Sequence, residues 1–537
     1  MRDRDPLEGV HRHRSAGVGM TGTTSPRPER TPVHADDRPD LVIVMTDQHR
    51  ADVHARDGFP LDTMPFVDSL AAQGVWFDRA YTTSPLCSPA RTSLLTGRWP
   101  SAHRVTQNPA ADQAVFGTDL FQAARGAGYA TALFGKNHTY LRAEDVDAYV
   151  DFMHDGAVEP PPDPVDASFD GWLAGLRHRT AEEPTPFPTE TQNPSRIVAA
   201  ALEWVRSMPS DVPLCVIVSF PEPHNPYQVP APYFDMFPSE SLPPLRSDTI
   251  PRDKADTWRY LHDLGDAAVD DYDGILPRAR SNYFGMLRLI DDQIRRLYDG
   301  LDDRHANRQR VIALTADHGD YVGEYGLVRK GAEVPDVLAR IPFVVVGDAI
   351  RASRPAEPSA PEPEHVSIAD LMPTFCEAMG VPIPDGVQGR SLWSVITGLE
   401  ASPAEFASAY VEQGMGGLPY EADDVLPDPM PGLFRDGPGG APRFDELNAV
   451  TQGGRRRKIR AGRWTLQVDV LGVCHLYDLE ADPAELVDRW DDGTDEAKGA
   501  ARALLAALAV WQMRAEDPLP TTPGGYLLKR DPRNWVR

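Results

Sequence analysis

The chain has 537 residues, of which 41% are hydrophobic and 25% are charged, so its composition is that of a folded protein and excludes wholesale disorder. Asp and Glu number 80 against 54 Lys and Arg, which gives a formal net charge of −26. Nucleic-acid binding proteins usually carry a basic face, so this charge argues against that class. Four cysteines in a chain of this length do not form a disulfide framework. The length indicates two or more domains, or one unusually large α/β domain.

The first forty residues are polar, charged and interrupted by prolines. They contain no apolar segment of the kind that a secretory signal peptide needs. No stretch of the chain approaches the roughly 20 apolar residues of a membrane-spanning helix. We therefore expect residues 1–38 to form a disordered tail, and we expect a cytoplasmic protein with no membrane partner.

Short continuous apolar runs recur along the chain and alternate with helical patterns. Such runs, bounded by polar turns, are typical of buried parallel strands. The expected strands are residues 41–45, 130–134, 214–220, 311–314 and 343–346, and the expected helices are 120–127, 197–208 and 283–301. This alternation predicts an α/β fold with a large mixed, mostly parallel sheet between layers of helices.

The last part of the chain has a different pattern. Residues 414–442 are rich in Gly and Pro and predict a linker or an irregular covering loop. Residues 464–468 and 474–477 indicate an antiparallel pair of strands, and residues 495–513 predict a final helix. We therefore expect a large domain over residues 39–400 and a smaller C-terminal α+β domain over 401–537.

Polar and ionisable residues follow four of the predicted strands. In open α/β sheets, ligands bind beyond the carboxyl ends of the strands, so we expect these residues to converge on one site. They are Asp47 and Gln48, Lys136 and His138, His224, and Asp317 and His318.

Two of these strand ends carry ligands that suit a divalent cation. Asp47, Gln48 and Asp317 offer oxygen atoms, which favour Ca²⁺, Mg²⁺ or Mn²⁺. His318 adds an imidazole, which tilts the preference away from a pure Ca²⁺ or Mg²⁺ site.

Cys87 stands at a predicted helix start, where Ser88 is the expected N-cap and Pro89 the first helical residue. Free backbone N–H groups at such a terminus favour an anion, and Arg91, one turn further on, is placed to bind the same anion. The other three cysteines, at positions 215, 376 and 474, lie in apolar segments and are interpreted as buried structural thiols.

The segment from Cys87 to Arg91, with the residues that follow as far as Arg98, resembles the signature of the type I sulfatases of the alkaline phosphatase superfamily. In that family the cysteine of C-x-P-x-R is oxidised to formylglycine by a separate enzyme. Further resemblances follow in the family's order over residues 38–490. They are the metal pairs Asp47-Gln48 and Asp317-His318, the G-K-x-H element at 135–138, the segment of His224, Lys330, and the L-Y-D-L sequence at 476–479.

The metal pairs depart from the commonest sulfatases, which have Asp-Asp and Asp-Asn. Asp-Gln with Asp-His resembles a subset that includes choline sulfatases and phosphonate monoester hydrolases. Asn108 stands where the latter place a substrate-contacting Asn, whereas Lys136 and His138 are sulfatase-like, because those hydrolases lack the G-K-x-H element. We therefore favour sulfate esters as substrates, and the alternative is a phosphonate monoester or phosphodiester hydrolase.

The resemblance implies a role for each matching residue. Formylglycine at Cys87 would be the nucleophile beside Arg91, with His224 as the general acid and His138 as the general base. Lys136, Lys330 and Asn108 would bind the substrate. Asp47, Gln48, residue 87, Asp317 and His318 would hold one divalent metal, for which Ca²⁺ is favoured over Mn²⁺.

The expected partners are a small sulfate ester and a formylglycine-generating enzyme, and a negatively charged surface favours a small ester over a long sulfated polysaccharide. Glu222 and Asp320 are interpreted as structural residues. Asp291 and Asp292 are interpreted as solvated residues on the polar side of a helix. A homo-oligomer is left open, with Trp99, Trp258 and Trp535 as candidate contact residues.

Overall fold

The structure is a computed structural model that describes residues 38–251, 254–305, 308–331, 333–351, 360–399, 404–419, 421, 423–424 and 453–516. All but the last residue of the predicted tail, 1–38, lies outside the described residues. So does most of the segment predicted as a linker, 414–442.

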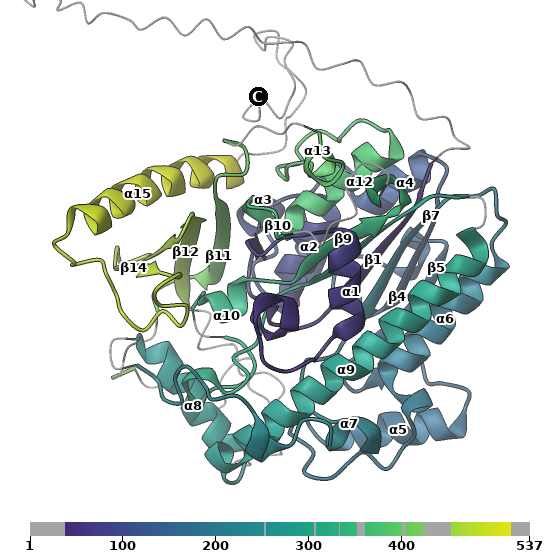
Figure 1. The fold of residues 1–537 in the computed structure, drawn as a ribbon, viewed down its shortest axis with the longest axis horizontal. Helices are drawn as coiled ribbons and strands as arrows, with labels where there is room; N and C mark the ends of the chain where they lie inside the picture. The colour runs from purple at the N-terminus through teal and green to yellow at the C-terminus, as the bar shows by residue number, and fades with distance from the viewer. Residues whose placement is uncertain are drawn as a thin grey trace, which may run out of the picture.

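An eight-stranded sheet forms the centre of the molecule (Figure 1). Its five middle strands run parallel, in the spatial order β8 (Arg310–Ala316), β1 (Asp40–Thr46), β7 (Leu214–Phe220), β4 (Ala130–Gly135) and β5 (Ala148–Met153). The edges are antiparallel and consist of β9 (Phe343–Gly347) with β2 (Val75–Trp76) on one side and β6 (Gly156–Ala157) on the other. The predicted mixed, mostly parallel sheet is confirmed.

Both faces of the sheet are buried, which explains why its strands are continuously apolar. Val42 and Val44 of β1 join one hydrophobic core, and Leu41, Ile43 and Met45 join the other. Helices α1 (Pro65–Gln73), α6 (Asn193–Ser207) and α9 (Tyr272–His305) contribute to the first core. Helices α2 (Cys87–Thr96), α4 (Leu120–Gly126) and α12 (Leu371–Met379) contribute to the second.

Shorter elements complete this part of the chain. They are β3 (Ala80–Tyr81) paired with β10 (Val366–Ser367), and helices α3 (Pro100–His103), α5 (Pro164–Gly175), α7 (Ala231–Phe234), α8 (Asp256–Ala268), α10 (Asp336–Ala339), α11 (Asp348–Arg351) and α13 (Trp393–Ile396). None of the helices in the described ranges combines the length and the hydropathy that crossing a bilayer requires.

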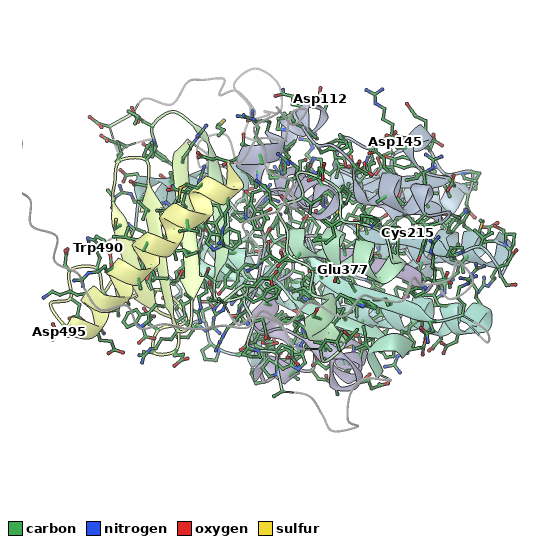
Figure 2. The ribbon with its side chains drawn as sticks, turned by 90° about the horizontal axis from the view of Figure 1, so that it is seen from above. Asp112, Asp145, Cys215, Glu377, Trp490 and Asp495 are labelled. Carbon is green, nitrogen blue, oxygen red and sulfur yellow. The ribbon has the colours of Figure 1, made fainter. Side chains whose placement is uncertain are left out.

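A second, antiparallel sheet forms the C-terminal unit. Its strands are β11 (Ala409–Gly416), β12 (Gly454–Ala461), β13 (Trp464–Asp469) and β14 (Cys474–Asp478). Helix α15 (Asp495–Ala515) lies across these strands (Figure 2). The predicted small α+β unit is confirmed, but the start of the expected linker is wrong, because residues 414–416 pair within β11.

The two units meet at a pair of tryptophans. The Trp99 and Trp511 ring centroids are 5.1 Å apart, and the Trp99 indole N–H donates to the carbonyl of Tyr410 at 3.1 Å. Trp99 and Trp258 are both 0% exposed, so their interpretation as contacts for a second subunit is wrong. Both side chains pack in hydrophobic cores of the chain itself. Trp535 lies outside the described residues.

The cysteines outside the predicted site differ in their burial. Cys215, within the main sheet (Figure 2), and Cys376, on α12, are buried as predicted, and burial raises the pKa of the Cys215 thiol. Cys474 is only partly buried, on β14, so the prediction of a buried thiol at that position is wrong.

Asp291 is 0% exposed, so its interpretation as a solvated carboxylate is wrong. Its two oxygens accept hydrogen bonds of 2.9 Å from the backbone N–H groups of Phe66 and Val67, which lie in the first turn of α1. Asp291 thus caps a helix that is distant in sequence, because those N–H groups have no partner within α1. Burial raises the pKa of Asp291 to about 7, against the effect of the two hydrogen bonds.

This raised pKa predicts a pH-dependent contribution to stability. Between about pH 4 and pH 7 the folded chain keeps the proton on Asp291, whereas the unfolded chain loses it, so the wild type loses stability as the pH rises. Asp291→Asn lacks this titration. We expect the variant to gain roughly 2–4 kcal/mol relative to the wild type over this range, in urea unfolding curves. Asp292→Asn, at the neighbouring position, is the matched control, and a pH-independent difference for Asp291→Asn would contradict the assignment.

Candidate active site

The predicted strand-end residues converge at one edge of the main sheet. The strands β8, β1, β7 and β4 are neighbours in that order, so the residues that follow them emerge side by side. Asp47 and Asp317 lie directly beyond β1 and β8, and both are 0% exposed. Lys136 directly follows β4 and His224 lies just beyond β7, and both are buried as well.

Arg91 holds this edge together. Its Nε donates to Asp317 at 2.8 Å, and its Nη2 donates to Asp47 at 3.2 Å. Its Nη1 donates to the carbonyl of Lys136 at 2.8 Å and to the hydroxyl of Ser219 at 2.7 Å. The guanidinium therefore binds two carboxylates from neighbouring strands, and its forked geometry fixes both. We interpret Arg91 as the residue that orients the two carboxylates.

Helix α2 begins at Cys87 itself, so the prediction of Ser88 as N-cap and Pro89 as first helical residue is wrong. The side chain of Asn108 takes the capping role, because its Oδ1 accepts the Ser88 backbone N–H at 3.1 Å. Asn108, predicted to contact substrate, thus supports the helix that carries residue 87. Pro89 remains compatible with a first turn, where backbone N–H groups lack helical partners.

The thiol of Cys87 lies among charged groups. Its Sγ is 3.4 Å from His318 Nε2, 3.5 Å from Lys136 Nζ and 3.7 Å from Asp47 Oδ1. Burial and Asp47 oppose ionisation, but Lys136, Lys330 and His318 together hold the pKa of Cys87 well below its usual range. This position favours an anionic group at residue 87.

Gln48 has its side-chain amide oriented by two partners. Its Nε2 donates to Asp320 at 2.6 Å, and its Oε1 accepts from Lys330 Nζ at 2.8 Å. The backbone φ of Gln48 is 65°, a region that costs free energy for a residue other than glycine. Its N–H donates to Asp317 and its carbonyl accepts from Tyr283, and these bonds hold it there. The amide oxygen therefore points toward Lys330.

Asp47 remains ionised in spite of its burial. Burial opposes the charge, yet Lys136 and Arg91 hold the pKa of Asp47 well below its usual range. The Lys136 ammonium is hydrogen-bonded to the Asp47 carboxylate. Lys330 is buried beside Gln48, so two lysines and one arginine surround the two carboxylates.

Three histidines gather next to Lys136. His224 Nδ1 lies 2.6 Å from the carbonyl of Asn225, and its ring stacks on that of His154 with centroids 3.6 Å apart. The ring of His178 meets both edge-on, at 5.5 Å and 6.0 Å. His138, the predicted base, belongs to none of these ring contacts, and its buried Nδ1 has no hydrogen-bond partner among the described residues.

His154 and His178 were missed by the sequence analysis. His154 follows β5, whose residues are mostly half-buried and therefore lack the continuous apolar run of the other strands. His178 follows α5 in a loop that carries no recognisable pattern. The parallel pairing of β5 with β4, which places both strand ends at one edge, is the signal that would have found His154.

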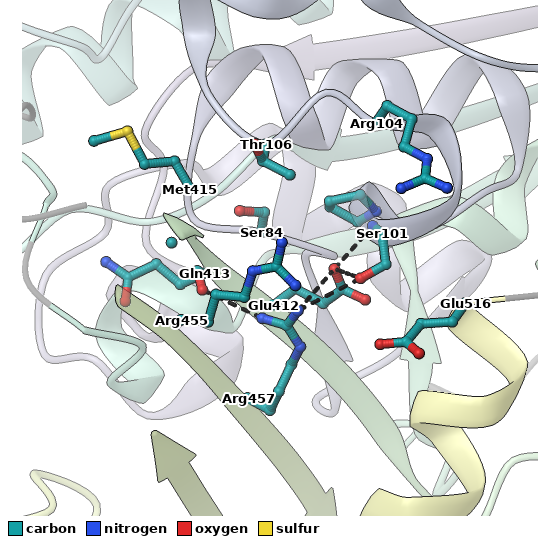
Figure 3. A pocket seen from close by; sticks show the side chains of 12 residues that line it. Ser84, Ser101, Arg104, Thr106, Glu412, Gln413, Met415, Arg455, Arg457 and Glu516 are labelled. Carbon is teal, nitrogen blue, oxygen red and sulfur yellow. Dashed lines mark hydrogen bonds and ion pairs between the residues drawn. The ribbon is translucent and has the colours of Figure 1, made fainter. Parts of the chain in front are cut away.

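A polar hollow of about 460 Å³ lies between the C-terminal sheet and the chain around α3 (Figure 3). Ser84, three residues before Cys87, lines it, as does Gln413, whose amide donates to the carbonyl of Gly331 beside Lys330. The hollow thus borders two segments that carry site residues. Its charged lining is mixed and consists of Arg104, Arg455, Arg457, Glu412 and Glu516.

Comparison with known proteins identifies the family. The sequence profile of the family named Sulfatase matches residues 39–381, which is more than half of the chain. The chain belongs to the sulfatase family. This sulfatase is similar to an arylsulfatase of Clostridium perfringens, at 26% identity over 67% of this chain and 78% of the relative. It is also similar to a choline-sulfatase of Rhizobium meliloti, at 26% identity over 89% of this chain and 88% of the relative.

Solved structures share the fold of this sulfatase. A phosphonate monoester hydrolase of Agrobacterium radiobacter superposes with a TM-score of 0.68 at 21% identity, over 89% of this chain and 96% of the hydrolase. The similarity spans both the large sheet and the C-terminal unit. The membership in a family of sulfuric ester hydrolases thus rests on the sequence, and the structural likeness concerns the fold.

The donor atoms of this sulfatase fit a divalent cation. One donor atom each from Asp47, Cys87, Asp317 and His318 lie within 4.8 Å of one another, and all four residues are buried. Two ligands at 2.3–2.6 Å from a common Ca²⁺ ion are at most about 5 Å apart, so the spacing is suitable. The amide oxygen of Gln48, also predicted as a ligand, accepts a hydrogen bond from Lys330 Nζ at 2.8 Å. These residues would hold the metal that the family implies.

Asp320 sets the direction of the Gln48 amide and accepts further hydrogen bonds from Tyr227 and from the backbone of Val322 and Arg329. We expect Asp320→Asn to lower the affinity for Ca²⁺ by about 10–100-fold, because an amide cannot accept all these donors. Calorimetric titration with Ca²⁺ measures the effect. Tyr227→Phe removes one donor to the same carboxylate and is the control, with a smaller expected loss. Unchanged affinity in Asp320→Asn would contradict the role of Gln48 as a ligand.

Proposed function

We propose that this protein hydrolyses the sulfate ester of a small alcohol or phenol and that residue 87 acts as formylglycine. The observation that carries the proposal is the position of Cys87. Its thiol is at the first residue of a buried helix and within 3.7 Å of Asp47, His318 and Lys136. A thiol with only a structural role packs among apolar side chains and does not require a carboxylate, an imidazole and an ammonium group around it.

The charges of the site suit the transfer of an anionic group. Lys136 and Lys330 approach from two sides, and a bound divalent cation would add to them. Preorganised charges in a buried site stabilise the charge that develops on the sulfuryl oxygens, and such interactions are commonly the largest contribution to catalysis. The surrounding protein is strongly acidic, so it repels long polyanions at a distance and favours a small ester.

Formylglycine formed from Cys87 would supply the nucleophile, and a divalent cation held by the predicted ligands would polarise a sulfate oxygen. The residues of the chain do the rest. Arg91 keeps Asp47 and Asp317 in place. Lys136 and Lys330 bind the sulfuryl oxygens. His224 donates its Nδ1–H to the Asn225 carbonyl, so its Nε2 faces the leaving oxygen, and the ring protonates that oxygen from Nε2 in its imidazolium form.

The proposal also includes partners. A formylglycine-generating enzyme would oxidise Cys87 before the chain is active. Ca²⁺ is the favoured metal because oxygen ligands predominate, and Mn²⁺ is the alternative because of His318.

Peptide mass analysis of residue 87 tests the proposed nucleophile. We expect an aldehyde in protein produced together with a formylglycine-generating enzyme, and sulfate release that rises with the converted fraction. Cys87→Ala should lose at least about 10³-fold in kcat/KM, because the nucleophile is absent. Full activity of protein that retains an unmodified cysteine would contradict the mechanism.

Rates on two substrates decide between the proposed function and a phosphonate hydrolase on the same site. We expect 4-nitrophenyl sulfate to be cleaved with a higher kcat/KM than the 4-nitrophenyl ester of phenylphosphonate. The lysine pair supports this order, since Lys136 belongs to the sulfatase-like G-K-x-H element. Good turnover of the phosphonate without sulfate release would establish the alternative.

A further inference from the structure

His154 lies at the tip of a tight turn next to the site. It follows β5 directly, and Gly156 begins the returning strand β6. Strand β5 is the parallel neighbour of β4, so its end emerges beside the residue that follows β4, which is Lys136. The topology therefore delivers a histidine to the centre of the charged cluster.

The contact between His154 and Lys136 determines which nitrogen of the imidazole carries the proton. Lys136 Nζ is 2.8 Å from His154 Nε2. An ammonium group only donates, so Nε2 accepts and the ring carries its proton on Nδ1. Burial, followed by the charge of Lys136, holds the pKa of His154 well below its usual range, so the ring is neutral.

The ring of His154 also packs against one face of the His224 ring. The two imidazoles are nearly parallel, with 14° between their planes and 3.6 Å between their centroids. His224 is held in its plane by the bond from Nδ1 to Asn225. The stacked face prevents the ring from leaving that plane, so the Nε2 of His224 keeps one direction.

The buried Nδ1 of His154 has no hydrogen-bond partner among the described residues. A buried donor without a partner costs free energy, so the contacts that set the position of this ring are those with Lys136 and His224. Within the described part of the chain, His138 makes neither a hydrogen bond to Lys136 nor a ring contact with His224.

We propose that His154 is a positioning residue of the active site, which directs the Lys136 ammonium through a hydrogen bond and fixes the ring of His224 by stacking. The inference rests on the proposed function for its kinetic consequences. Lys136 acts on the transferred group, whereas His224 acts on the leaving oxygen. The two contacts of His154 therefore affect different parts of the reaction.

Two substitutions separate these contacts. His154→Phe keeps an aromatic ring for His224 and removes the acceptor for Lys136. We expect kcat to fall by about 10-fold for every leaving group, because the transferred sulfuryl group is common to all substrates. His154→Gln keeps an acceptor near the position of Nε2 and removes the ring. We expect its loss in kcat to grow from about 3-fold for 4-nitrophenyl sulfate to about 100-fold for an alkyl sulfate, whose leaving oxygen needs a proton.

These rates are measured on a series of aryl and alkyl sulfates with the full chain, and thermal unfolding verifies that each variant is folded. In both variants KM should change less than kcat. His262→Gln, on α8, is the control and should match the wild type. The proposal is overturned if either His154 variant stays within about twofold of the wild type across the series.

A second measurement does not depend on activity. Two-bond ¹H–¹⁵N spectra of protein with labelled histidine report the protonated nitrogen of each ring. We expect the signal that disappears in His154→Phe to be that of an Nδ1–H ring and to shift in Lys136→Met. A proton on Nε2 would overturn the inference. This outcome is readable even if no sulfate ester is cleaved, so it distinguishes a failure of this inference from a failure of the proposed function.

Discussion

A single buried guanidinium determines the geometry of the site. Asp47 and Asp317 emerge from neighbouring parallel strands and are both fully buried, and two like charges at that distance would repel each other. Arg91 bonds to both and offsets this repulsion, so Asp47 stays ionised, whereas burial and the charge of Asp47 still raise the pKa of Asp317. Because Arg91 lies one turn into α2, the same bonds bring the start of that helix, and with it Cys87, to the edge of the sheet.

Cationic side chains are concentrated at the site although the whole protein is acidic. Arg91, Lys136 and Lys330 gather around Asp47 and Asp317, while the chain as a whole has a net charge of −26. The interactions are short and buried, so water and salt screen them little. Net charge therefore reports on long-range repulsion of polyanions and says little about which small anion the site can bind.

Several residues act by orienting others. Asp320 turns the amide of Gln48, Asn108 caps the helix of Cys87, and we assign to His154 the positioning of Lys136 and His224. Asp320 and His154 lie in a loop and a turn between the regular elements, and Asn108 begins a short 3₁₀ helix. The strands supply a rigid edge, and the connecting segments supply the hydrogen bonds that fix each side chain on it.

The sequence by itself determined the sheet and most of the reacting groups, because a continuous apolar run marks a strand buried on both faces and the residues after parallel strands share an edge. Asp47, Lys136, His224 and Asp317 could be found in this way. Only the tertiary structure decided which groups lie next to them. His154 follows β5, a strand that has no continuous apolar run.

The helix caps illustrate the same limit. Ser88 has the local pattern of an N-cap, yet Asn108, 20 residues away, accepts its backbone N–H. Asp291 appears solvated by its position on a helix, yet it caps α1 across 225 residues. The periodicity of apolar residues indicates which face of a segment is buried. It contains no information about a hydrogen-bond partner from a distant segment, so such a partner is found only in the tertiary structure.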